Sequence, residues 1–122
     1  MRFLRVMMFS FIDKPSCFDE FEDKPALWIS YNLAPVYYQL TQRGDAIEIH
    51  IGAQGRKGKQ HLRKASEAAK LWIKETFPWC KCVLVITKLK SIDNLCKKIN
   101  LCFLRKAEFE KGLMNIWVWR YE

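Results

Sequence analysis

A short basic segment with two glycines, Gly55-Arg-Lys-Gly-Lys-Gln60, joins two stretches of different periodicity. Before it, residues 46–53 alternate apolar and polar side chains, which is the pattern of a strand. After it, residues 59–77 place apolar side chains three and four positions apart, as in an amphipathic helix. A turn from a strand into a helix directs backbone N–H groups and the positive end of the helix dipole toward one place. The segment 53–60 is therefore predicted to bind an anion such as a phosphate or a carboxylate.

Two titratable side chains, Glu48 and His50, lie on one face of the predicted strand 46–53, and three isoleucines lie on the other. Either could accept a proton, directly or through a water, if this face opens toward a substrate. The structural alternative is that Glu48 forms an ion pair with a lysine and that His50 is a half-buried histidine with satisfied hydrogen bonds.

Five basic residues fall within nine positions with no acid among them: Arg56, Lys57, Lys59, Arg63 and Lys64. Residues 1–50 carry five Lys/Arg and seven Asp/Glu, a net charge of −2, whereas residues 51–122 carry sixteen and six, a net charge of +10. Such a surface attracts a coenzyme, a nucleic acid or an acidic protein surface, although a solvated helix face explains the charge equally well. Base stacking on Trp72 is not expected, because this residue falls on the apolar stripe of the helix.

The rest of the chain predicts a mixed α/β domain. We expect strands at 2–11, 26–31, 36–42, 46–53, 82–86, 101–109 and 113–119, and helices at 16–22, 59–77 and 92–99. The second, third and fourth strands should form an antiparallel meander. Because a long helix separates strands 46–53 and 82–86, these two should be parallel with a right-handed connection. In the last helix Ser91 is the expected N-cap, and Asn100 is expected in the left-handed conformation that ends it.

Length and composition favour one domain over residues 1–122 and exclude several classes of protein. Half of the residues are apolar, which argues against disorder, and no stretch is apolar for long enough to span a membrane. The apolar N-terminal segment 1–12 lacks a small-residue cleavage site, so we interpret it as a strand of a cytoplasmic protein. The five cysteines have no zinc-binding or redox spacing, which favours free thiols and no metal.

The order of elements, with the basic turn between strand 46–53 and the long helix, resembles the GCN5-related N-acetyltransferase (GNAT) superfamily over residues 46–120. Residues 1–45 would then be a variable, shortened N-terminal half. In that superfamily the turn follows the pattern Arg/Gln-x-x-Gly-x-Gly/Ala, and its N–H groups hold the pyrophosphate of acetyl-CoA. Lys57-Gly-Lys-Gln-His-Leu62 resembles this turn in its basic residue and first glycine. Residues 89–101 resemble a second sequence motif of this superfamily, further along the chain. Lys98 is at the position of the lysine in that motif, and Cys96 is at the position of its tyrosine.

Residues 55–103 are similar, without gaps, to divergent acetyltransferase-like proteins of podophages, among them internal virion proteins. In those proteins a basic helix start of the type Gly-Lys-x-Lys-x-x-Phe-Arg-Lys replaces the glycine-rich loop, as residues 56–64 do here. The resemblance implies a phage or prophage origin, and therefore a place in the host cytoplasm or in the virion.

The resemblance implies the acyl-CoA N-acyltransferase fold, a mixed central sheet with flanking helices. It also implies an acetyl-CoA-dependent N-acetyltransferase acting on an amine-bearing acceptor. Glu48 or His50 would be the base, and Cys96 would donate a proton to the leaving thiolate unless it is a plain buried cysteine. The coenzyme would contact Ile51, Ala53, Gly55, Arg56, Lys57, Gly58, Lys59 and Gln60.

The departures from the GNAT patterns support a second hypothesis. A catalytically inactive protein with this fold could bind a host protein, a virion component or a nucleic acid through its basic surface. The final strand, with Trp117-Val-Trp119, could pair across a two-fold axis in a homodimer or lie inside the monomer's own sheet.

Overall fold

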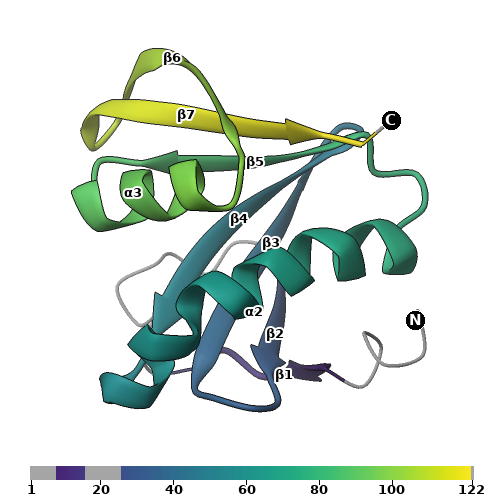
Figure 1. Cartoon of the computed structure of the whole chain (residues 1–122). Helices are drawn as coiled ribbons and strands as arrows, with labels where there is room; N and C mark the ends of the chain where they lie inside the picture. Colours follow the sequence, from purple (N-terminus) through teal and green to yellow (C-terminus); the bar gives the residue numbers. More distant parts are fainter. Residues whose placement is uncertain (1–7, 16–25, 122) are drawn as a thin grey trace.

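The computed structural model describes residues 8–15 and 26–121. In this part of the chain a seven-stranded mixed sheet has the order β1-β2-β3-β4-β5-β7-β6, and two helices pack against it (Figure 1). The strands are β1 (Phe9–Ile12), β2 (Leu27–Tyr31), β3 (Val36–Arg43), β4 (Ala46–Ala53), β5 (Cys82–Thr87), β6 (Cys102–Phe109) and β7 (Gly112–Arg120), and the helices are α2 (Gly55–Thr76) and α3 (Lys90–Lys98). The predicted α/β class is confirmed. The helix predicted at 16–22 and the start of the first predicted strand lie outside the described residues.

Strands β2, β3 and β4 form the predicted antiparallel meander, and β1 pairs antiparallel with β2 at its outer edge. Strands β3 and β4 pair over their whole length, from Val36–Ala53 to Arg43–Ala46. The turn between them contains Gly44 at a φ of 63°, a conformation that glycine adopts without steric cost. This short turn determines which side chains of β3 lie beside those of β4.

Strands β4 and β5 are parallel, as the long intervening helix predicted, but they pair only at Ala46–Cys82, Ile47–Val83 and Glu48–Leu84. Beyond Glu48, β4 stays paired with β3 and β5 stays paired with β7. The sheet therefore forks after Glu48, and Figure 1 shows the two strands diverging toward the start of α2.

Strand β7 lies between β5 and β6, so Trp117-Val-Trp119 is inside the monomer's sheet and β6 is the outer strand. Helix α3 begins at Lys90, and its N-cap is Leu89 rather than the predicted Ser91. The Thr87 hydroxyl accepts a hydrogen bond from the Leu89 N–H at 3.0 Å, but no side-chain hydrogen bond caps the helix itself. Asn100 has a φ of 66°, as predicted.

Helix α2 begins at Gly55, four residues before its predicted start. Gly55 has a φ of 67°, which lets the chain turn from strand to helix with only Gln54 between them. The prediction placed the start too late because the first turn is polar and shows no apolar periodicity. The basic residues therefore lie on the first turns of the helix and not in a loop.

Both described helices pack on one face of the sheet and bury one continuous core. From the sheet this core takes Ile47, Ile49, Val83, Val85 and Trp117, from α2 Ala65, Ala69, Trp72 and Ile73, and from α3 Leu95 and Cys96. The burial of Trp72 confirms its place on the apolar stripe. Because side chains alternate along a strand, Glu48 and His50 point to the opposite face. Neither helix is long and apolar enough to cross a membrane.

Candidate functional site

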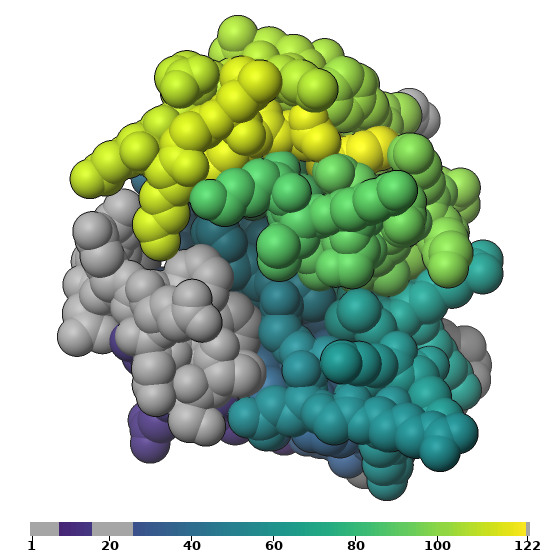
Figure 2. Space-filling view, turned by 90° about the vertical axis from the view of Figure 1, so that its left-hand side faces the viewer, coloured from purple at the N-terminus to yellow at the C-terminus, as the bar shows by residue number. Residues whose placement is uncertain are grey.

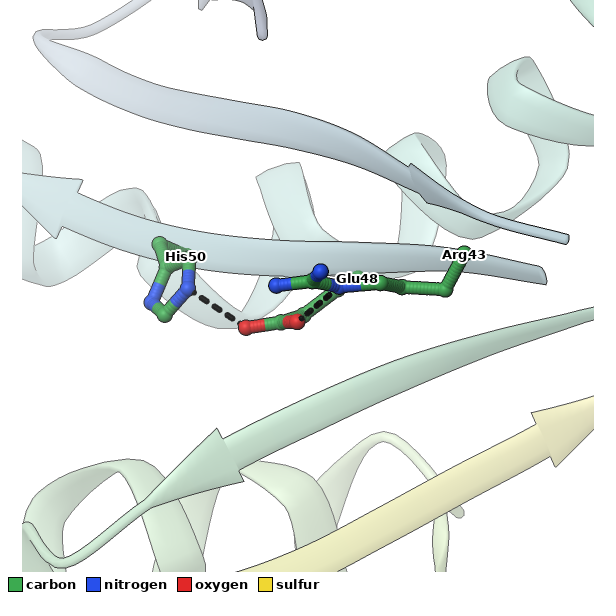
Figure 3. Close-up of polar contacts among 3 residues, drawn as sticks. All are labelled: Arg43, Glu48 and His50. Atoms are coloured by element: carbon green, nitrogen blue, oxygen red, sulfur yellow. Dashed lines mark hydrogen bonds and ion pairs between the residues drawn. The ribbon is translucent and has the colours of Figure 1, made fainter. Parts of the chain in front are cut away.

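Glu48 lies at the fork of the sheet, as the last residue of β4 that pairs with β5. Its side chain is buried, and both carboxylate oxygens have partners. Oε1 accepts a hydrogen bond from Nε of Arg43 at 2.9 Å, and Oε2 lies 2.7 Å from Nε2 of His50. Figure 3 shows the carboxylate between these two side chains. The structure thus brings together the two residues that the sequence put forward as proton acceptors.

The partners of Glu48 keep it ionised. The hydrogen bond with His50 lowers the pKa of this carboxyl most, burial opposes the shift, and the bond from Arg43 lowers the pKa further. When a neutral His50 donates Nε2–H to this anion, Nδ1 is the acceptor nitrogen of its ring. The pair thus joins an anionic carboxylate to an imidazole, a group that can act as a base.

Arg43 is the partner of Glu48 that the sequence reasoning missed; the alternative it considered was a lysine. In the β3–β4 register Thr41 lies opposite Glu48, so Arg43 is the diagonal neighbour two residues further along the same face. Gln39 lies opposite His50 and is also buried. The short turn at Gly44 was the signal that could have identified this register.

The start of α2 lies just past the far end of β4, and the six residues between Glu48 and Gly55 correspond to about 20 Å along a strand. Gly58 donates the first hydrogen bond of the helix, to the Gln54 carbonyl at 3.2 Å. The N–H groups of Gly55, Arg56 and Lys57 precede that bond and have no acceptor within the helix. The helix has no side-chain N-cap bond and no acid in its first turn. Its positive end is therefore open to an anion.

Gly58 lets this helix end approach the sheet closely. A Cβ atom at Gly58 would lie 2.6 Å from the Pro35 carbonyl oxygen and 3.4 Å from Cβ of Ala53. The Gln54 N–H is bound to the same Pro35 oxygen at 2.9 Å. Gly58 is thus a packing glycine that holds the start of α2 against the ends of β3 and β4.

The basic side chains at this end point to solvent. Exposed residues of the first three turns of α2 are Arg56, Lys57, Lys59, Gln60, Arg63 and Lys64. Among the described residues one ion pair involves this group, at 3.8 Å between Arg63 and Glu67. Figure 2 faces this end of the molecule and shows atoms of β4 at the surface between α3 and α2. The basic helix start and the pair of Glu48 with His50 thus belong to the same part of the fold, at the end of β4 and at the fork.

Cys96 is not part of this arrangement. It is completely buried in the core on the helix-covered face of the sheet, opposite to the face of Glu48 and His50. Burial raises the pKa of its thiol to about 12, and the Asp93 carboxylate adds to the effect. An ordinary thiol has a pKa near ~8.5, so this group is a poor donor to a thiolate. The structure gives no support to Cys96 as the proton donor.

Metal chemistry has no candidate site in the described residues, since no cluster of three or more His, Cys, Asp or Glu side chains could hold an ion. Asp93 instead has a structural role that the sequence reasoning missed. It accepts hydrogen bonds from Nε1 of Trp117 at 2.7 Å and from Nδ2 of Asn115 at 3.0 Å, which ties α3 to β7.

No protein-family model matches the sequence, and no curated protein is similar to it. Solved structures are similar in fold. An acetyltransferase from Bacillus subtilis in complex with CoA has a TM-score of 0.63 at 14% identity, and an IAA acetyltransferase from Bacillus cereus has 0.63 at 19%. Both alignments cover 93% of this chain and 98% of the other. This chain has the GNAT acetyltransferase fold.

A third structure with this fold is the ribosomal-protein-S5-alanine acetyltransferase from Vibrio fischeri, with a TM-score of 0.64 at 8% identity. The alignment covers 78% of this chain, which spans 61% of the length of that enzyme. At such identities the likeness concerns the GNAT fold, and the activity has to be argued from the residues of this chain.

Proposed function

We propose that this protein is an acetyl-CoA-dependent N-acetyltransferase. The observation that carries the proposal is the arrangement of two features along β4. The ionised Glu48, paired with His50, lies at the fork of the sheet, and the uncapped, basic start of α2 lies at the end of the same strand. The fold is shared with acetyltransferases, one of which was solved with CoA.

The residues at the start of α2 fit an anionic coenzyme. The N–H groups of Gly55, Arg56 and Lys57 would bind the pyrophosphate, and the exposed side chains of Lys59 and Gln60 would add charge and hydrogen bonds. Gly58 would hold the helix start in place. The backbone of Ile51 and Ala53, on the part of β4 that has left β5, would contact the extended arm of the coenzyme.

The coenzyme, when bound, supplies the thioester that carries the acetyl group. The residues of this chain would prepare the acceptor amine, which is a nucleophile only in its neutral form. His50, held by Glu48, would take the amine proton directly or through a water, and Glu48 would stabilise the imidazolium that forms. Arg43 would position Glu48. Cys96 has no role in the proposal.

An acetyl-transfer assay by mass spectrometry over a panel of amines tests this proposal. Glu48→Gln should lower kcat by at least roughly tenfold, in the range typical of a lost acid–base group, and leave the affinity for the coenzyme unchanged. Lys57→Glu/Lys59→Glu should instead raise the KM for acetyl-CoA. Equal effects of both variants on KM alone would contradict the assigned roles.

A second candidate function is binding without catalysis. The observation that favours it is the exposed basic surface of α2, which needs no reaction to attract an acidic protein surface or a nucleic acid. This candidate suits a phage or prophage protein of the internal virion type. It predicts salt-sensitive binding to an anionic partner with no acetyl transfer, lost on charge reversal at Arg56, Lys57 and Lys59.

A further inference from the structure

Strand β6 is an exposed edge of the sheet. It pairs with β7 on one side, and no described strand pairs with its other side (Figure 1). Seven of its eight residues are exposed and the eighth is half-buried. Three of them are large apolar side chains: Phe103 and Leu104, about half exposed, and Phe109, 38% exposed. A free edge of this kind offers unpaired N–H and C=O groups to another strand.

The residues Arg105-Lys-Ala-Glu-Phe109 are complementary to themselves when the strand runs antiparallel to a copy. A two-fold axis through Ala107 places Lys106 opposite Glu108 of the second copy, and the same contact recurs on the other side of the axis. On the other face of the sheet it places Arg105 opposite Phe109 of the second copy. Opposite charges and cation–aromatic pairs at directly opposed positions are stabilising.

Other registers are unfavourable. An axis through Arg105 or Lys106 would place two like positive charges directly opposite each other. An axis through Glu108 would do the same with two carboxylates, and an axis through Phe109 would oppose Glu108 and Glu110. Toward the N-terminal end, the irregular pairing between Phe103 and Arg105 interrupts the edge. Ala107 is thus the centre that combines regular backbone, a small side chain on the axis and complementary charge.

We propose that this protein forms a homodimer in which the β6 strands of two copies pair antiparallel about Ala107, continuing the sheet across the two-fold axis. The regular part of the edge is short, so the contact is small and belongs to the weak, concentration-dependent class. Lys106 and Glu108 are both exposed, and neither forms an ion pair with another described residue of the monomer.

Sedimentation velocity over protein concentrations from roughly 10 µM to 1 mM, which covers weak interfaces, measures this dimer. Lys106→Glu and Glu108→Lys each replace two attractive pairs by two repulsive ones, and each should weaken dimerisation by roughly tenfold or more. The double variant Lys106→Glu/Glu108→Lys exchanges the charges within each pair and should restore the dimer.

Glu110→Lys is the matched control, because it makes the same change of charge as Glu108→Lys. Glu110 lies in the exposed turn next to the paired segment and is opposite no charged residue in this register. It should leave dimerisation close to that of the wild type. Thermal unfolding of each variant shows whether the monomer remains folded. A wild type that is monomeric over the whole concentration range would overturn the proposal. A double variant that dimerises as weakly as the single variants would overturn it too.

Discussion

The Nε2 atom of His50 lies 2.7 Å from Oε2 of Glu48, where β4 parts from β5. Two residues apart on a strand, the side chains share a face, and the contact joins a buried carboxylate to a ring that is 25% exposed. Arg43 occupies the other carboxylate oxygen. This relationship makes Glu48 the fixed member of the pair and His50 the member closer to solvent.

The pairing of Glu48 predicts a specific loss of stability in acid. The pKa of this carboxyl is below its ordinary value of 4.5 in the folded protein, so its contribution to stability is complete above that value and is lost as the pH falls through the folded pKa. Glu48→Gln cannot titrate. Urea unfolding from pH 7 to 3 should show a steeper fall of the unfolding free energy below pH ~4.5 for the wild type than for Glu48→Gln. Parallel curves would show that the contacts of Glu48 do not stabilise its ionised form.

Gly58→Ala should destabilise the protein, although alanine is the better helix former by about 1 kcal/mol. The added Cβ would lie 2.6 Å from the Pro35 carbonyl oxygen, so the start of α2 must move away from the sheet. We expect a loss of about 1–3 kcal/mol, as for other overpacked sites, measured by chemical denaturation. Gln60→Ala, on the exposed side of the same turn, is the control and should change stability by less than about 0.5 kcal/mol. A Gly58→Ala variant more stable than the wild type would contradict the close packing.

The hydroxyls of Tyr38 and Ser66 form a buried hydrogen bond of 2.9 Å between β3 and α2. Ser66→Ala leaves the phenol, 1% exposed, without this partner and should cost about 1–3 kcal/mol. Tyr38→Phe should cost less, because the Ser66 hydroxyl can turn to a carbonyl of its own helix. In a double-mutant cycle the two losses should not add, since the second substitution removes the group that the first left unpaired. Additive losses would mean that the two hydroxyls do not interact.

The variant Cys96→Ala tests whether Cys96 has a structural or a catalytic role. Removing a buried side chain should lower stability by about 1–2 kcal/mol, at the small end of core truncations. The rate of acetyl transfer per folded molecule and its pH profile should stay unchanged, because the thiol is enclosed in the core. A loss of the alkaline limb of the pH profile in this variant would return Cys96 to the mechanism.

Periodicity was enough to predict those features of the arrangement that depend on a single element or connection. The alternation along β4 placed Glu48 and His50 on one face of the strand, and the structure shows them in contact. The parallel pairing of β4 with β5 followed from the helix between them. These features need only the local pattern of side chains and the handedness of the connection.

Features that depend on contacts between elements were missed. The hydrogen bond from Arg43 to Glu48 can be predicted only when the register of β3 on β4 is known. The hydrogen bond from Trp117 to Asp93 likewise depends on the position of α3 over β7. The start of α2 was placed too late because it is determined by backbone conformation at Gly55 and by the approach of Gly58 to Pro35, neither of which leaves an apolar pattern.

Calorimetric titration with acetyl-CoA tests the central claim most directly, which is that the start of α2 binds the anionic coenzyme at the end of β4. The wild type should bind with micromolar affinity at low salt and more weakly at moderate salt, because exposed charges are screened. Lys57→Glu/Lys59→Glu should abolish this binding, whereas Glu48→Gln, about 20 Å along β4 from the helix start, should leave it intact. A wild type that binds no acetyl-CoA at either salt concentration would contradict the account.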